Sequence, residues 1–319
     1  MRDAIGGYFE LELRKGEHYH KNALRLNTAR NCFEYVLRSK NCSKVYIPYY
    51  TCDVMLELIN KLGIDYEFYH INEYLEPVKL PELKEGESFL YTNYFGLKQE
   101  CVKRLASEYG KQLIVDNAQA FYAEPIKGVD TFYSARKYFG VPDGAYLYTT
   151  SLLMLDFEQD YSCERMSHLL KRIDLSAETG YQDFRNNEGT LRHQDIKKMS
   201  KLTETILMGI DYEDVRNRRR ENYSWLDTAL GSTNRIHFDI TEECAPMVYP
   251  YMTDNSSLKQ KLIENKIFVA TYWPNVFEWC EQDDWEYDLA DHIVFIPIDQ
   301  RYHKEDMRRI VETIKTVKY

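Results

Sequence analysis

The stretch LIVDNAQA (residues 113–120) is an apolar strand that ends on a carboxylate, Asp116. A little further on, GVDTFYSARKYFGVPDGAYLYTT (residues 128–150) contains two strand-like runs, and the segment between them carries Ser134 and Lys137. A lysine between two apolar strands, with a serine three residues before it, is unusual for a plain turn. These two stretches place a carboxylate, a hydroxyl and an amine at or just after strand ends.

In the first half of the chain, segments with the helical spacing of apolar residues alternate with short apolar strands. This interleaving predicts an α/β fold with a mainly parallel central sheet that helices cover on both faces. Ligands of such sheets bind beyond the carboxyl ends of the strands, where Asp116, Ser134 and Lys137 are expected. The predicted helices cover 28–40, 53–63 and 99–110, and the predicted strands cover 44–50, 65–71, 87–96, 112–120, 129–135 and 145–150.

The second half of the chain has a different character. Helical patterns rich in charge cover 163–175, 194–209 and 211–231. The cluster RNRRR (216–220) is flanked by acidic residues, which favours a solvated helix face over a nucleic-acid patch. From about residue 231 the pattern is strand, helix, strand, helix. We therefore expect a large α/β domain over 1–230 and a smaller C-terminal α+β domain over 231–319.

Composition narrows the class of protein. The chain has 319 residues and a formal net charge of −10, which argues against binding to nucleic acid or to an anionic membrane surface. Seven scattered cysteines, none in a C-x-x-C pair, are typical of reduced thiols in the cytoplasm rather than of disulfides or structural zinc. No apolar run has the length of a signal peptide or a membrane span. We expect a cytoplasmic protein without a metal site.

Several common catalytic motifs are absent: the sequence contains no G-x-G-x-x-G, no G-x-x-x-x-G-K-[ST] and no G-x-S-x-G. A lysine and a carboxylate at strand ends suit pyridoxal phosphate, whose aldehyde forms an imine with lysine and whose ring nitrogen needs an acidic partner. Lys137 and Asp116 are the candidates. Ser134, Thr28 and the helix start after Thr28 are candidates for holding the phosphate. A surface lysine in a turn is the plainer alternative, and spacing alone does not exclude it.

LIVDNAQA, followed by Ser-x-x-Lys and then by an acidic residue and glycine, resembles the DegT/DnrJ/StrS sugar aminotransferases. These are pyridoxal phosphate enzymes of fold type I, and the chain looks like a short, divergent member. The resemblance implies a PLP-dependent transferase fold with pyridoxal 5′-phosphate as cofactor. Further similar segments are RLNTARNCFEYVL (25–37), VYIPYYTCDVMLELINKLGIDYEFYHI (45–71), FLYTNYFG (89–96), KKMSKLTETIL (197–207), RNRRRENYSWL (216–226) and HIVFIPI (292–298).

The resemblance also assigns roles to residues. It implies that Lys137 is the imine lysine, that Asp116 faces the pyridine nitrogen and that Gln119 lies near the cofactor ring. Ala29 and Arg30 fall in the phosphate loop, where the family usually has Gly and Thr. Two plainer roles stay open: Gln119 as the cap of a chain reversal, and Thr28 as a helix N-cap.

The sequence departs from the family pattern at several positions. The segment after the lysine is one residue shorter, and its second glycine is Ala145. The aromatic residue that stacks on the cofactor falls at Cys52, with Tyr50 nearby as a substitute. The asparagine that reaches the partner subunit's phosphate falls near Ile196. These departures bear on substrate identity and dimer geometry more than on cofactor binding.

The resemblance implies an aminotransferase that moves an amino group from glutamate to a nucleotide-linked keto sugar, in surface polysaccharide or related sugar biosynthesis. It also implies a homodimer, in which residues of the 181–196 segment, such as Arg192, His193 or Gln194, would close the partner's pocket. Two alternatives stay open: a non-catalytic or regulatory protein of this fold, and another pyridoxal phosphate reaction on a sugar. A dehydratase would typically need Lys137 replaced.

Overall fold

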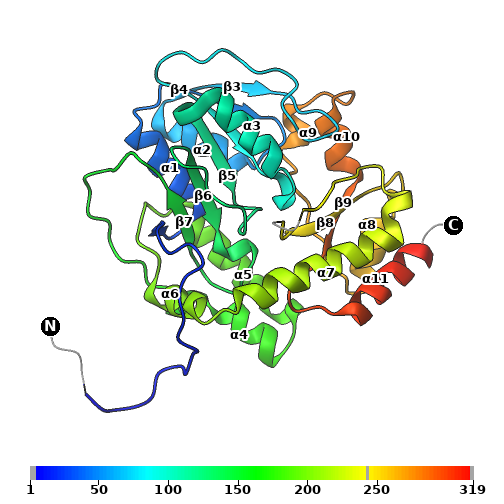
Figure 1. The fold of residues 1–319 in the computed structure, drawn as a ribbon. Coiled ribbons are helices and arrows are strands. Elements are labelled where there is room, and N and C mark those ends of the chain that lie inside the picture. Colours follow the sequence, from blue (N-terminus) through cyan, green and yellow to red (C-terminus); the bar gives the residue numbers. More distant parts are fainter. Residues whose placement is uncertain (1–4, 242–243, 317–319) are drawn as a thin grey trace.

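The computed structural model describes residues 5–241 and 244–316 (Figure 1). Its centre is a seven-stranded sheet with the strand order β1-β7-β6-β5-β4-β2-β3. The strands from β2 to β6 are mutually parallel, whereas β7 is antiparallel to both of its neighbours, β1 and β6. The predicted mainly parallel sheet is confirmed. Its strands are β1 Leu24–Leu26, β2 Lys44–Pro48, β3 Asp65–Tyr69, β4 Glu87–Thr92, β5 Leu113–Asn117, β6 Asp130–Ser134 and β7 Ala145–Tyr148.

Helices cover both faces of this sheet. Successive residues of a buried strand point to opposite sides, so each face presents apolar side chains that must be covered. In β5, Ile114 joins a core formed with helices α1 (Ala29–Ser39) and α2 (Asp53–Leu62). Leu113 and Val115 join the larger core on the other face, which includes α3 (Gln99–Tyr109). Because these strands are apolar along nearly their whole length, both faces of the sheet must be buried, and each face has its own core.

The second half supplies four helices: α4 (Ser167–Asp174), α5 (Ala177–Arg192), α6 (Lys201–Met208) and α7 (Tyr212–Leu230). The sequence predicts a helical pattern over 194–209, but the helix begins only at Lys201. Residues before it are extended, because their backbone bonds to other segments: Asn27 N donates to Lys197 O at 2.9 Å, and Met199 N donates to Arg25 O at 3.1 Å. Those bonds replace the intrahelical ones.

Helix α7 also departs from expectation at one position. The sequence predicts a solvated face for RNRRR, yet Arg219 is only 1% exposed. Arg219 lies four residues after Val215 and four before Tyr223, and both of these are buried. Helical spacing therefore turns Arg219 inward with them.

The C-terminal part contains a two-stranded antiparallel sheet of β8 (Val248–Met252) and β9 (Ile293–Pro297). The predicted alternation of strands and helices after residue 231 is confirmed, with two additional short helices between the strands. The helices are α8 Leu258–Glu264, α9 Val276–Trp279, α10 Trp285–His292 and α11 Lys304–Thr316, and one-turn 3-10 segments lie at Tyr94–Gly96, Gly110–Gln112, Ala135–Lys137, Cys163–Arg165 and Gly231–Thr233.

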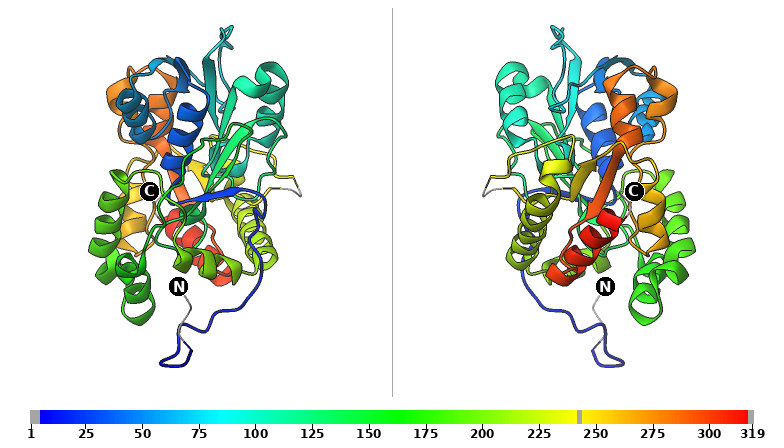
Figure 2. Two further views of the ribbon diagram at one scale, coloured as in Figure 1. Left: turned by 90° about the vertical axis from the view of Figure 1, so that its left-hand side faces the viewer. Right: turned by 90° about the vertical axis from the view of Figure 1, so that its right-hand side faces the viewer.

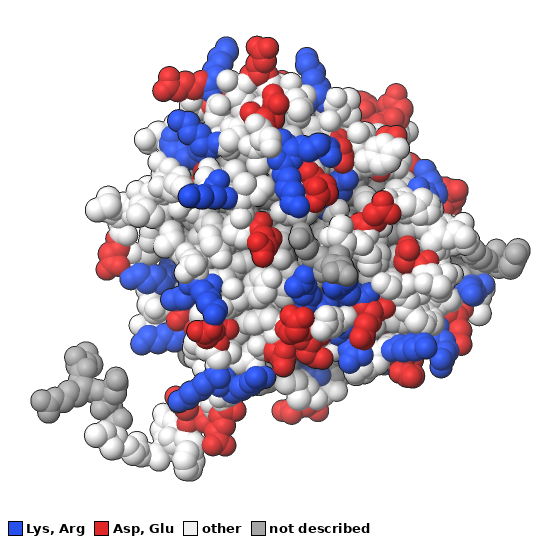
Figure 3. All heavy atoms as spheres, in the orientation of Figure 1, with Lys and Arg blue, Asp and Glu red and all other residues white. Residues whose placement is uncertain are grey.

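The surface shows three general features. The first described residues are exposed and extend away from the body of the molecule (Figure 2), whereas His18 and His20, further along the same segment, are buried. Basic and acidic side chains are interspersed over the face shown in Figure 3, so neither sign forms a continuous patch there. Within the described ranges, no helix combines the length and the apolar character needed to cross a membrane.

Candidate active site

Lys137 ends a single 3-10 turn, Ala135–Lys137, that follows β6 directly. The turn is tied to the start of β7, since Ala135 N donates to Gly144 O at 3.1 Å. The Lys137 side chain is exposed, and its Nζ lies 5.3 Å from the ring centroid of Tyr272. Tyr272 belongs to the C-terminal part, so the amine lies where two distant parts of the chain meet. No pattern in the sequence links Tyr272 to Lys137, and sequence reasoning misses it.

Asp116 lies near the end of β5, the strand next to β6. Its carboxylate is buried, and Oδ1 accepts a hydrogen bond from Ala118 N at 2.8 Å. Burial raises the pKa of Asp116 to about 6, while the Ala118 N–H and the positive charge of Lys137 act in the opposite direction. Lys137 and Asp116 are therefore within electrostatic reach of each other. The structure brings together the two residues that the sequence places at neighbouring strand ends.

Cys52, the residue before α2, is also within electrostatic reach of Lys137. Burial raises the pKa of the Cys52 thiol to about 11, although the charge of Lys137 partly offsets this. The thiol is therefore neutral at physiological pH. Arg30 interacts electrostatically with Cys52 and Asp53, and burial lowers the pKa of its guanidinium. These contacts place the start of α1 next to the start of α2, close to Lys137.

The start of α1 offers donors to an anion. Thr28 is its N-cap, and the Thr28 hydroxyl accepts a hydrogen bond from Asn31 N at 3.0 Å. The N–H groups of Ala29 and Arg30 have no carbonyl one turn earlier in the helix to bond. Arg30 Nη1 donates to Leu191 O at 3.0 Å, whereas its Nε is buried without a hydrogen-bond partner among the described residues. The cap at Thr28 and the positive end of the helix dipole at the start of α1 are both compatible with phosphate binding.

Ser134 and Gln119 have different surroundings. Ser134 ends β6, and its buried side chain lies one residue before the Lys137 turn. Gln119 is 3% exposed, and its Oε1 accepts a hydrogen bond from Phe95 N at 3.0 Å. Phe95 has a φ of 57°, in the left-handed region that non-glycine residues rarely adopt. Gln119 thus holds a chain reversal, which is the plainer of the two roles that the sequence left open.

Tyr50 is packed into the core. Its side chain is fully buried, its ring packs edge-on against Trp273 at 4.9 Å, and its hydroxyl donates to Tyr272 O at 3.2 Å. These contacts commit Tyr50 to the core. The sequence position where the resemblance expects an aromatic ring is Cys52.

The segment around Ile196 contacts its own chain. Ile196 is buried in the core beside α1 and α2. Arg192 Nη2 forms an ion pair with Asp53 Oδ2 at 2.8 Å, and Gln194 Oε1 accepts a hydrogen bond from Asn27 Nδ2 at 3.2 Å. Arg192 and Gln194 therefore bond within their own chain, to the first residue of α2 and to the residue before the N-cap of α1.

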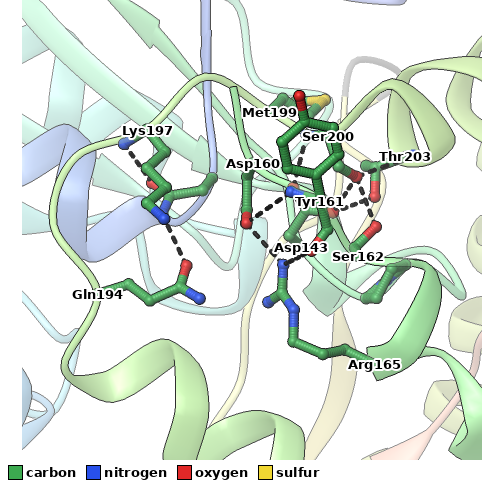
Figure 4. A network of polar contacts seen from close by, with 12 residues as sticks. Asp143, Asp160, Tyr161, Ser162, Arg165, Gln194, Lys197, Met199, Ser200 and Thr203 are labelled. Carbon is green, nitrogen blue, oxygen red and sulfur yellow. Dashed lines mark hydrogen bonds and ion pairs between the residues drawn. The ribbon is translucent and has the colours of Figure 1, made fainter. Parts of the chain in front are cut away.

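A buried polar network fixes the chain just after Lys137 (Figure 4). Asp143 is fully buried, and its carboxylate accepts hydrogen bonds from Ser200 N at 2.8 Å, Ser200 Oγ at 2.6 Å and Thr203 Oγ1. Ser200 Oγ also contacts Ser162 Oγ at 2.6 Å. Asp143 thus joins the end of the Lys137 loop to the N-terminus of α6. In the sequence, Asp143 is visible only as the acidic residue of the acidic-glycine pair.

Comparisons with known proteins identify the fold. No protein-family model matches the sequence, and no curated protein matches it either. The sugar aminotransferase CalS13 from Micromonospora echinospora is 13% identical, with a TM-score of 0.60 over 92% of this chain and 87% of its own. A DegT DnrJ EryC1 StrS aminotransferase from Brucella abortus is 13% identical, with a TM-score of 0.61 over 92% and 85%. Spr1654 from Streptococcus pneumoniae, in its PLP-form, is 14% identical, with a TM-score of 0.62 over 92% and 86%. The chain therefore has the fold of these aminotransferases, which is the fold that the resemblance in its sequence implies.

Proposed function

We propose that this chain is a pyridoxal phosphate-dependent aminotransferase of the DegT/DnrJ/StrS type. The observation that carries the proposal is the proximity of Lys137 to Asp116 at the carboxyl ends of adjacent parallel strands. The other residues of the site fit the same cofactor. The start of α1, with Ala29, Arg30 and the nearby Ser134, offers N–H, guanidinium and hydroxyl donors to a phosphate.

Bound pyridoxal phosphate would supply an electron sink for amino-group transfer. The Lys137 amine would anchor the cofactor and then carry a proton between two carbons of the reacting group as general base and acid. Asp116 would face the ring nitrogen and keep it protonated. With a pKa of about 6, its carboxyl is mostly ionised at neutral pH, as that role requires.

We also propose the substrates and setting that accompany this chemistry. The amino donor is glutamate and the acceptor a nucleotide-linked keto sugar, in surface polysaccharide or related biosynthesis. Several structural neighbours are sugar aminotransferases, which supports the sugar. The cytoplasmic location rests on the seven free cysteines, and the division into domains 1–230 and 231–319 rests on the sequence pattern.

The homodimer is likewise a proposal. Because Arg192 and Gln194 are bonded within their own chain, a partner subunit would have to be reached by other residues of 181–196. His193 has an exposed side chain and is one such candidate.

The first test is covalent fixation of the cofactor. Borohydride treatment of the purified protein incubated with pyridoxal phosphate should attach the cofactor to the peptide that contains Lys137. The variant Lys137→Ala should abolish labelling, while Lys127→Ala, which removes an exposed lysine from the preceding loop, should not. Labelling of another lysine, or of none, would refute the assignment.

A non-catalytic protein of this fold is the second candidate, favoured by the cysteine at the stacking position. The two candidates differ in one measurement. The aminotransferase should convert the bound cofactor to its amine form when glutamate is added in a single turnover. A non-catalytic protein would bind the cofactor at Lys137 and leave it unchanged.

A further inference from the structure

Tyr138, the residue that follows Lys137, is bonded through its backbone, its ring and its hydroxyl. It caps the 3-10 turn Ala135–Lys137, and its N–H donates to Ala135 O at 3.1 Å. A single 3-10 turn is only weakly held by its own hydrogen bonds, so its place in the molecule depends on contacts with other segments. We infer that Tyr138 is a positioning residue, which holds the Lys137 turn at a fixed place relative to Asp116 and to the C-terminal part.

The hydroxyl of Tyr138 joins the Lys137 turn to the turn that follows Asp116. The hydrogen-bonded pairing of β5 with β6 stops at the ends of these strands, so it does not connect the segments beyond them. There, Tyr138 OH donates to Gln119 O at 2.8 Å. Gln119 lies in the same tight turn as Asp116, whose Oδ1 accepts a hydrogen bond from Ala118 N. The Tyr138 hydroxyl therefore connects the segment that carries the amine with the segment that carries the carboxylate.

This hydrogen bond is shielded from water. Tyr138 and Gln119 are both buried. Gly96, in the turn after β4, has a φ of +76°, and a Cβ there would lie 3.1 Å from Gln119 O and 3.4 Å from Tyr138 OH. Glycine at this position therefore leaves room for the bond. Burial also raises the pKa of the Tyr138 hydroxyl well above its usual range, so the group keeps its proton and remains a donor.

Tyr138 is also bonded to the C-terminal part of the chain. Its hydroxyl lies 3.2 Å from Ala245 O, a second acceptor, and its carbonyl accepts a hydrogen bond from Gln300 Nε2 at 2.8 Å. Ala245 lies shortly before β8, and Gln300 lies shortly after β9. The two ends of the small sheet therefore both reach the residue next to Lys137.

The buried Arg219 contacts both the ring and the carbonyl of Tyr138. Its guanidinium carbon lies 4.3 Å from the centroid of the Tyr138 ring, and its Nη2 donates to Tyr138 O at 3.3 Å. Its Nη1 donates to Met247 O at 2.9 Å. A cation over an aromatic ring is attracted to it, most strongly where water is excluded. Arg219 thus helps to keep the ring in the orientation that directs its hydroxyl to Gln119 O.

These contacts bear on the chemistry because the Lys137 side chain is itself exposed. The position of its amine therefore depends on where the backbone of the turn is held. Displacing a reacting group by about 1 Å can slow a reaction on the order of a hundredfold. A tie between the two turns keeps the amine of Lys137 and the carboxylate of Asp116 in register, which pairing of the strands alone does not achieve.

The purpose of this positioning rests on the proposed function, since Lys137 and Asp116 are its proposed reacting groups. The tie itself is present in the cofactor-free protein. It can be measured there, so failure of the tie and failure of the proposed function are separate results.

The first measurement is hydrogen–deuterium exchange on the full cofactor-free chain, analysed by mass spectrometry. Tyr138→Phe keeps the ring and removes the hydroxyl. Exchange should become about fivefold faster in the peptides that cover 117–121 and 135–141, because both segments lose a shared hydrogen bond. Tyr69→Phe is the matched control, since the buried Tyr69 hydroxyl donates to Leu90 O at 2.8 Å and connects β3 with β4. Its effect should be confined to those two strands.

The second measurement uses protein loaded with pyridoxal phosphate. Circular dichroism in the visible region, per bound cofactor, reports the orientation of the cofactor, which a loss of stability alone does not change. Tyr138→Phe should lower this signal. In a single turnover at saturating L-glutamate, its rate should fall by about tenfold or more, with little change in the half-saturating glutamate concentration. Tyr69→Phe should leave the signal and the rate unchanged.

Unchanged exchange in both segments of Tyr138→Phe, or the same increase there in Tyr69→Phe, would overturn the inference. Faster exchange with unchanged dichroism and rate would make Tyr138 a contact for stability alone, which overturns its positioning role. If the unmodified protein binds no pyridoxal phosphate, the proposed function fails, and exchange alone decides whether Tyr138 ties the two turns. Should Tyr138→Phe not fold, Gln300→Met removes the bond to the Tyr138 carbonyl and should speed exchange over 135–141 and lower the dichroism.

Discussion

Asp116 is buried, and its proposed role requires a charged carboxylate. In water an aspartate ionises near pH 4, but here burial raises the pKa to about 6. The Ala118 N–H and the charge of Lys137 stabilise the ionised carboxylate and so offset part of the cost of burying it. In the cofactor-free protein, keeping Asp116 ionised therefore costs free energy. Such costs are common for ionisable groups at functional sites.

The pH dependence of stability follows from this shift. Because the folded pKa is raised, Asp116 contributes stability that is fully present below its unfolded pKa and is lost as the pH rises through about 6. From about pH 4 to about pH 8, the free energy of unfolding of the cofactor-free protein should lose up to about 3 kcal/mol on this account. Asp116→Asn should lack that loss, as measured by urea unfolding at both pH values.

Asp174→Asn is the control for this measurement, since Asp174 is exposed and contacts no ionisable partner among the described residues. Its pH profile should match that of the unmodified protein. An Asp116→Asn profile that is indistinguishable from the control would show that Asp116 ionises in the folded protein as it does in water.

The segment from Gln194 to Thr203 shows how one element positions another. It is extended beside β1 as far as Ser200, which is the N-cap of α6. The Ser200 hydroxyl accepts a hydrogen bond from Thr203 N. Asp143 binds the same helix start from the loop after Lys137. Gly144, at φ +112°, leaves room for this approach, since a Cβ there would lie 2.8 Å from Thr203 Cγ2. The loop that carries Lys137 is thereby anchored to α6.

Removing this anchor should be strongly destabilising. Asp143→Ala deletes a buried carboxylate and leaves Ser200 N, Ser200 Oγ and Thr203 Oγ1 without their acceptor. We expect a loss of about 3 kcal/mol or more in the free energy of unfolding. Asp156→Ala removes an exposed carboxylate that pairs with Lys198, and should leave the free energy of unfolding nearly unchanged. Similar losses for both variants in denaturant titrations would contradict this account.

At the scale of the whole molecule, one continuous hydrophobic core joins the central sheet to the C-terminal part. It contains residues of β4 and β5 as well as of β8, β9 and α11. Polar bonds also cross between them: Asn275 Nδ2 donates to Thr51 O at 2.9 Å, and Tyr50 OH donates to Tyr272 O. These contacts place Tyr272 over Lys137. The C-terminal part thus completes the candidate site.

Glu286 makes a further buried connection between the two parts. It is 1% exposed on α10 and accepts hydrogen bonds from Ile71 N at 2.6 Å and from His70 Nδ1 at 3.2 Å. Glu286→Ala leaves the Ile71 N–H buried without a partner and should lower the free energy of unfolding by about 2–3 kcal/mol. Because the core is shared, calorimetry should show one shifted transition in place of two. Separate transitions for the two parts would mean that they do not depend on each other.

Much of this architecture follows from the sequence alone. Apolar periodicity predicts the strands and helices of the first half, and strand ends predict where Asp116, Ser134 and Lys137 lie, because parallel strands bring their carboxyl ends to one edge. Helix signals such as Thr28 before α1 and Gly63 after α2 are local and act within one turn. These features depend on neighbours in sequence, which a single sequence displays.

Other features were decided only by tertiary structure, because they depend on contacts between residues far apart in the chain. The 194–200 segment has a helical pattern, yet bonds to Arg25, Asn27 and Asp143 hold it extended. Tyr50 stands two residues before the position where an aromatic ring is expected, and its contacts with Trp273 and Tyr272, far away in the chain, could not be foreseen. Arg219 is buried because α7 packs on the C-terminal sheet, and Tyr272 reaches Lys137 because the core joins both parts. Local pattern sets which conformations are favourable, and packing between distant segments selects among them.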